Sequence, residues 1–138
     1  MKKIIMGMVL IFSVNLYSSQ YTDLMTGNGK TLKEGMVIAN QHCDNGDGLL
    51  CLVLGIIYDT GDGVKKDGAK AQKYFEKSCE AKESQGCYNA GVGHYNGSRV
   101  KKNYVKSYQY LDKASKLGDK GAQENLSMLC KNNPWACK

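Results

Sequence analysis

The chain has 138 residues, of which 42% are hydrophobic and 23% are charged, and its formal net charge is +6. This length is enough for one domain with one modest core. The lysines are scattered and mostly adjoin acidic residues, as at Glu76-Lys77 and Asp112-Lys113. That pattern indicates a solvated surface of mixed charge and argues against a nucleic acid partner.

The N-terminus has the layout of a cleaved secretory signal peptide, in which a basic start precedes a short apolar stretch. Lys2 and Lys3 precede the apolar residues 4–14. A membrane span needs about twenty apolar residues, so an uncleaved anchor is the weaker alternative. We predict a signal peptide over 1–19, a flexible mature N-terminus over 20–30, and no stable membrane span after cleavage. The protein is then periplasmic or secreted.

Six cysteines form three close pairs, and two of these pairs recur at an interval of 36 residues. Six cysteines allow fifteen disulfide connectivities. We expect the three local pairings because two of them fit the repeat. Disulfides at a fixed interval predict a repeat protein in an oxidising compartment. The expected disulfides are Cys43–Cys51, Cys79–Cys87 and Cys130–Cys137.

The first copy of the repeat, residues 51–86, reads as two helices. The apolar run from Leu49 to Tyr58 predicts a helix buried between neighbours, and glycines at 61 and 63 end it. A second helix is expected from Asp67, a favoured N-cap residue, with apolar residues at helical spacing behind it. Gly86 is expected to mark the boundary to the next unit.

The second copy, residues 87–122, matches the first at nine of 36 aligned positions. A turn is expected at Asn96-Gly97-Ser98, and Asn103 is expected to cap the following helix. Partial units flank the two copies, as is usual for terminal repeats, and Pro134 is expected to prevent further helix. We therefore predict a repeat domain over 31–138, made of a half unit (31–50), full units (51–86 and 87–122) and a C-terminal cap (123–138).

The pattern Leu54-Gly55-x-x-Tyr58-x-x-Gly61-x-Gly63-Val64, with Lys66-Asp67 and the helix that ends at Cys79, resembles the Sel1-like repeat. The added C-x7-C spacing resembles the Helicobacter cysteine-rich proteins. The resemblance covers about residues 31–130 and implies an all-α fold. That fold is a right-handed α/α solenoid of Sel1-like, tetratricopeptide-like repeats clipped by disulfides. The second copy departs from the pattern, because His94 replaces the tyrosine and Arg99 replaces the second turn glycine.

The resemblance implies two functions from different classes. Sel1-like repeats mostly serve as scaffolds for protein–protein contact, so the first prediction is an interaction module for a protein or peptide of the cell envelope or host. The cysteine-rich branch is also described as binding penicillins and slowly hydrolysing β-lactams. The alternative is therefore a β-lactam or peptidoglycan-related ligand, or a weak β-lactamase.

Catalytic and metal-binding patterns are sparse. A serine β-lactamase needs S-x-x-K together with S-D-N and K-T-G elements, and only one S-x-x-K is present, from Ser98 to Lys101 in an expected loop. His42 and His94 are far apart, and C-x-x-C spacing does not occur. The loop 44–48 has glycines where a calcium loop needs oxygen ligands. We assign no catalytic residue and expect neither metal nor cofactor.

A binding surface can be assigned from the register of the repeats. In tetratricopeptide-like solenoids the first helix of each unit lines the concave face. Aromatic and aliphatic side chains there suit a peptide-binding groove. The alternative is that these residues complete the core of a short solenoid. The predicted binding residues are Leu52, Ile56, Asp59, Tyr88, Val92, Tyr95, Asn96, Glu124 and Met128.

Overall fold

The computed structural model describes residues 32–138, which form six α-helices of 13 residues each and a closing 3₁₀ turn. The predicted signal peptide (1–19) and N-terminal segment (20–30) lie outside the described residues. The elements are α2 (Leu32–Asp44), α3 (Gly48–Thr60), α4 (Gly68–Glu80), α5 (Ser84–Asn96), α6 (Tyr104–Lys116), α7 (Lys120–Asn132) and η1 (Pro134–Cys137).

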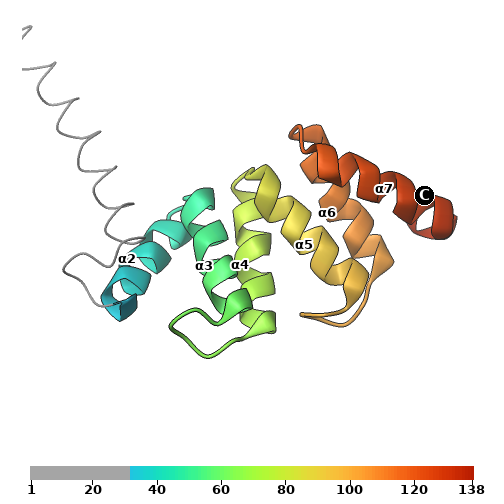
Figure 1. Ribbon diagram of the computed structural model, residues 1–138. Coiled ribbons are helices and arrows are strands. Elements are labelled where there is room, and N and C mark those ends of the chain that lie inside the picture. The colour runs from blue at the N-terminus through green and yellow to red at the C-terminus, as the bar shows by residue number, and fades with distance from the viewer. Residues whose placement is uncertain (1–31) are drawn as a thin grey trace, which may run out of the picture. The chain divides into compact units, whose positions relative to one another are not determined.

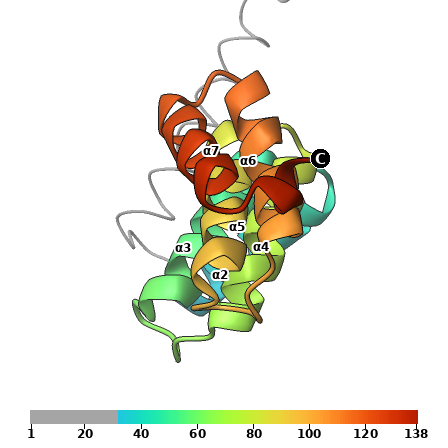
Figure 2. The same ribbon diagram turned by 90° about the vertical axis from the view of Figure 1, so that its right-hand side faces the viewer.

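Residues 39–138 form one compact unit in which α3 packs on α4, α4 on α5, α5 on α6, and α6 on α7. Figure 1 shows these helices following one another in a row, and Figure 2 views the row from the side of α6 and α7. The part of the chain that the structure describes contains no β-strand. The predicted all-α, right-handed solenoid of paired helices is confirmed.

The predicted helix ends are confirmed at both full units. Asp67 and Asn103 are the N-caps of α4 and α6, and each side chain accepts a hydrogen bond from the backbone N–H three residues later, at 2.9 and 3.0 Å. Gly61 and Gly97 end α3 and α5 in the left-handed conformation, with φ of 75° and 67°. These positions favour glycine because a Cβ atom is strained there.

The three predicted disulfides are confirmed as Cys43–Cys51, Cys79–Cys87 and Cys130–Cys137. The first joins α2 to α3, the second joins α4 to α5, and the third joins α7 to η1. Among the described residues no cysteine is free. On the chain-entropy account, closing a loop of this size stabilises the fold by about 2.5 kcal/mol. The second disulfide therefore clips one full unit to the next.

One expectation about an element boundary was wrong, and the one about Pro134 holds for the α-helix, which ends at Asn132, but not for the 3₁₀ turn after it. Gly86 does not mark a boundary: it lies within α5, whose N-cap is Glu83. A Cβ atom at position 86 would overlap the buried Ser78 side chain of α4, so close contact between the helices explains this glycine. Pro134 does not end helical structure altogether, because it occupies the first turn of η1, where a missing N–H costs nothing.

The core is built around a close approach of the two helices in each unit. A Cβ atom on Gly55 of α3 would come within 2.6 Å of the Phe75 ring of α4. One repeat later, a Cβ atom on Gly91 would come within 2.8 Å of Leu111 Cγ. Phe75 and Leu111 are each only 1% exposed. The same glycine contact therefore recurs at the same position of both units.

Arg99 ties the second unit to the first. Its Nε and Nη2 donate to the two carboxylate oxygens of Asp59 at 2.7 and 2.8 Å, and its Nη1 donates to the Asn89 carbonyl oxygen at 3.0 Å. The guanidinium also lies over the Phe75 ring, 4.8 Å from its centroid. The arginine that departs from the repeat pattern at position 99 thus forms a bidentate ion pair between the units.

We expect Gly86→Ala to lower the free energy of unfolding, although alanine has the higher helix propensity, because the new methyl group meets Ser78 and the Cys79 backbone. Gly121→Ala is the matched control in the first turn of α7. A Cβ atom there has no neighbour closer than 3.4 Å, so this variant should be neutral or stabilised by up to about 1 kcal/mol. Urea unfolding of the oxidised proteins measures both. A Gly86→Ala variant as stable as Gly121→Ala would contradict the packing described.

We expect Asp59→Asn to destabilise the protein by about 1 to 2 kcal/mol at neutral pH, because the Arg99 charge loses its partner. The hydrogen bond from Arg99 lowers the pKa of Asp59 below 3.8, so this stability is present above about pH 4 and is lost as the pH falls through the folded-state pKa. The difference in unfolding free energy between the wild type and Asp59→Asn should therefore shrink in acid. The exposed Asp62→Asn is the control, and an equal effect there would refute the role given to the ion pair.

Candidate functional site

The predicted binding residues of α3 lie in three different environments. Leu52 is 7% exposed and packs in a core cluster with Phe75. Asp59 is half-buried, and its carboxylate is held by Arg99 as described above. Ile56 is 44% exposed. Of the three, Ile56 alone presents an apolar side chain to solvent.

The predicted binding residues of α5 include two tyrosines that are each partly buried. The Tyr88 hydroxyl accepts a hydrogen bond from Asn125 Nδ2 of α7 at 3.2 Å, which links α5 to α7 through their side chains. The Tyr95 ring packs against Tyr104, with centroids 5.5 Å apart. Val92, between the two tyrosines, is also half-buried, and Asn96 is exposed at the end of the helix. These tyrosines have fixed positions and still reach the surface.

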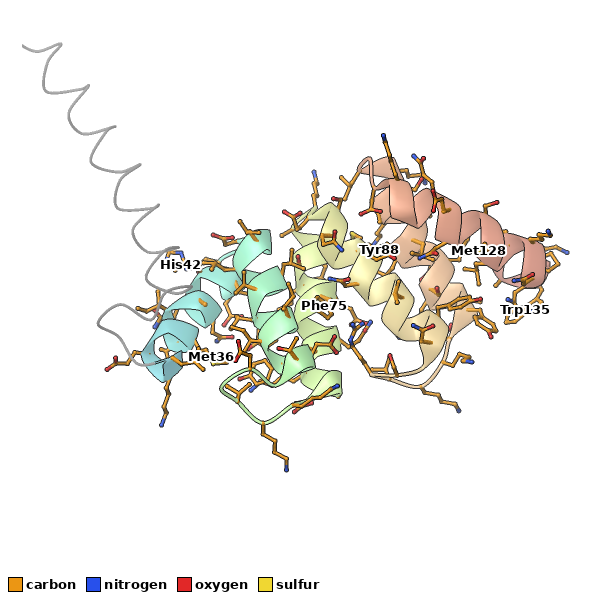
Figure 3. All side chains as sticks on the ribbon, viewed as in Figure 1. Met36, His42, Phe75, Tyr88, Met128 and Trp135 are labelled. Carbon is orange, nitrogen blue, oxygen red and sulfur yellow. A yellow bond between two sulfur atoms is a disulfide. The ribbon has the colours of Figure 1, made fainter. Side chains whose placement is uncertain are left out.

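On α7 both predicted residues, Glu124 and Met128, are exposed, and Met128 is 55% exposed. Figure 3 shows Tyr88 on α5, Met128 on α7 and Trp135 beyond it in η1. We define the first-helix surface as the accessible side chains on the first helices of successive units. Its members are Ile56, Tyr88, Val92, Tyr95, Asn96, Glu124 and Met128.

Trp135 is a surface residue that the sequence analysis did not identify. It is 61% exposed, and its ring meets Tyr104 edge-on with centroids 6.1 Å apart. Because Tyr104 also packs on Tyr95, the three aromatic rings form a chain that extends the first-helix surface toward the C-terminus. The available signal was the position of the single tryptophan beside Pro134, in a segment interpreted only as a cap.

A second feature lies mainly on the second helices of the units, α4 and α6. We call it the lysine basin, an open cavity of about 480 Å³ between α4, the end of α5, the loop after it, and the start of α6. Four lysines and one glutamate are its clearly charged residues, so its lining is strongly positive. The lining residues are Ala69, Gln72, Lys73, Glu76, His94, Val100, Lys101, Lys102, Asn103 and Lys106.

The floor of the lysine basin is polar and tightly connected. Glu76 Oε1 lies 2.9 Å from His94 Nε2 and accepts a hydrogen bond from Gln72 Nε2 at 3.0 Å. Gln72 Nε2 also donates to the Ala90 carbonyl oxygen at 3.0 Å. The His94 ring stacks on Tyr110 with centroids 5.7 Å apart. Burial and the charge of Glu76 raise the pKa of Tyr110, so its hydroxyl stays neutral over the physiological range.

The serine of the S-x-x-K pattern is exposed in the loop between α5 and α6. Within residues 32–138 no hydrogen bond joins Ser98 to Lys101. No group of three or more His, Cys, Asp and Glu side chains in that range is placed to hold a metal ion. None of the described helices is long and apolar enough to cross a membrane.

Residues 51–82 and 84–119 match the Sel1 repeat. These two segments cover the helix pairs α3–α4 and α5–α6 almost entirely. No curated protein sequence matches the chain at a significant level.

Several solved structures are also similar to this chain. Cysteine-rich protein B of Helicobacter pylori is similar over 76% of this chain and 79% of its own, with 30% identity and a TM-score of 0.68. A Sel1 repeat protein of Oxalobacter formigenes shares the fold at 23% identity, over 80% of this chain and 86% of its own, with a TM-score of 0.70.

A protective antigen of uropathogenic Escherichia coli strains is also similar, at 26% identity and a TM-score of 0.68. The match spans 81% of this chain but only 25% of that larger antigen. Taken with the paired helices, the recurring glycine contact and the disulfides between helices, these likenesses lead to one conclusion. The chain belongs to the Sel1-repeat proteins, in the family of the Helicobacter cysteine-rich proteins.

Proposed function

We propose that this protein is an extracytoplasmic interaction module that binds a protein or peptide of the cell envelope or host through its first-helix surface. The observation that carries the proposal is the row of accessible apolar side chains on successive first helices. Ile56 and Met128 are 44% and 55% exposed, and Tyr88 and Tyr95 lie between them along the chain. Sel1 repeats generally mediate protein interactions, which supports this reading.

The character of this surface favours an apolar or aromatic segment as the bound element. The Asp59 charge on α3 is neutralised by Arg99, so this part of the surface offers little net charge for recognition. Tyrosines that are already held by neighbours lose little side-chain entropy when a partner binds. The tyrosine chain Tyr95–Tyr104 continues to the exposed Trp135, and such aromatic side chains often dominate binding energy.

The disulfides support an oxidising compartment for this function. All cysteines of the described residues are paired, and disulfides of this kind persist in the periplasm or outside the cell. A rigid, clipped row of helices also keeps its surface preorganised, which reduces the entropy lost on binding. The periplasmic or secreted location is part of the proposal.

The binding test uses peptides selected from a random library with the oxidised wild-type protein. Ile56→Lys should weaken their binding about tenfold or more, because a charged side chain replaces an apolar contact on the α3 part of the surface. Met128→Lys should act in the same direction. Both side chains are exposed, so the variants should fold as the wild type does.

Val105→Lys is the matched control, because Val105 is 43% exposed, close to the 44% of Ile56, but lies on the second helix α6. Its affinity for the selected peptides should equal that of the wild type. If Ile56→Lys and Val105→Lys weaken peptide binding equally, the first-helix surface is not the binding site. The same follows if neither Ile56→Lys nor Met128→Lys weakens binding.

A further inference from the structure

We propose that the lysine basin is a second binding site, which takes an anion carrying a phosphate or sulfate group. The basin is formed by α4, α6, the end of α5 and the loop between α5 and α6. It shares no residue with the first-helix surface, so this proposal stands independently of the partner proposed above.

The charge of the lining selects for an anion. Lys73, Lys101, Lys102 and Lys106 line the basin, and all four are exposed at its rim. Glu76 is the only carboxylate in the lining, and it already faces the His94 imidazole and the Gln72 amide. The N-terminal end of α6, which begins after Asn103, adds the positive end of a helix dipole at the same wall.

The kind of cation in the basin favours a doubly charged oxyanion over a carboxylate. The planar fork of an arginine binds carboxylates and phosphates in a fixed geometry, whereas lysines act as point charges. Arg99, on the neighbouring loop, does not line the basin because Asp59 holds its guanidinium. Attraction in the basin therefore depends on the total charge of the ligand, and a phosphate or sulfate dianion carries more charge than a single carboxylate.

The floor of the basin has hydrogen-bonding capacity that the protein leaves unused. His94 is 4% exposed and lines the cavity, and its Nδ1 has no hydrogen-bond partner among the described residues. Because Nε2 faces the Glu76 carboxylate, Nε2 carries the proton of the neutral ring and Nδ1 is the unpartnered nitrogen. Buried polar atoms without partners are uncommon in folded proteins and need an explanation. In that tautomer Nδ1 is an acceptor, so the hydroxyl of a hydrogen phosphate group can pair with it, whereas sulfate, which carries no proton at neutral pH, cannot.

Comparison of the two units separates this site from the ordinary lysines of the repeat. Lysines also stand one repeat earlier, at Lys65, Lys66 and Lys70, so three of the four rim lysines are common to both units, whereas Lys73 corresponds to Val37. The floor is different, because its polar residues have apolar or neutral counterparts 36 positions earlier. Those counterparts are Met36 for Gln72, Asn40 for Glu76 and Tyr58 for His94.

The test is a titration of the oxidised protein, labelled with ¹⁵N, with inorganic phosphate and separately with sulfate at constant ionic strength. The amide chemical shifts of residues 100–106 and of His94 should change and reach saturation with at least one of the two anions. The separate titrations show which oxyanion is preferred. If neither anion produces saturable shifts at these residues, or if the shifts spread evenly over all lysine-rich segments, the proposal is wrong.

Two double variants of equal charge sharpen the result. Lys101→Gln/Lys102→Gln should weaken binding about fivefold, the loss expected for one or two partly screened ion pairs. Lys65→Gln/Lys66→Gln removes the same charge one repeat earlier and should leave the affinity unchanged. Equal weakening by both pairs would show that net charge alone attracts the anion, and would overturn the site.

Glu76→Gln should have the opposite effect on anion affinity. The amide oxygen can still accept the hydrogen bond from His94, while the like charge that opposes an anion is removed, so binding should tighten. Glu80→Gln is the control, because Glu80 is exposed one turn later on α4 and does not line the basin. A weaker affinity in Glu76→Gln, in a variant that unfolds as the wild type does, would contradict the assignment of the floor.

Discussion

In each full unit the backbone of the first helix touches the main core side chain of the second helix. Gly55 meets Phe75, and 36 residues later Gly91 meets Leu111. Because a Cβ atom fits at neither glycine, the two helices pack closer than ordinary side chains would permit. Phe75 also packs with Leu52 and with Ala90 of the next unit, so this contact fixes the pair and the start of its neighbour together.

The helices, their caps and the disulfides could be predicted because each depends on nearby residues or on the repeat period. Asp67 and Asn103 act on the backbone three residues away, and the cysteine pairs are local. Gly86 was misread because its reason is a contact with another helix. Trp135 and the lysine basin were missed for the same cause, since they depend on side chains that folding brings together from different elements.

The two residues that depart from the repeat pattern, His94 and Arg99, both form contacts between the two full units. Arg99 joins the units through Asp59 on one side, and His94 joins them through Glu76 on the other. The first contact neutralises a charge near the first-helix surface. The second forms the floor of the lysine basin. One pair of substitutions therefore strengthens the junction between units and shapes both candidate sites.

We expect Arg99, His94 and the Cys79–Cys87 disulfide to make the two full units unfold together, as one cooperative unit. Native-state hydrogen exchange of the oxidised protein tests this most directly, because it reports an opening free energy for each helix. The slowest amides of α3 and α4 should then share one opening free energy with those of α5 and α6. If α3 and α4 open together at a clearly lower free energy while α5 and α6 stay protected, the units are independent and the claim is wrong.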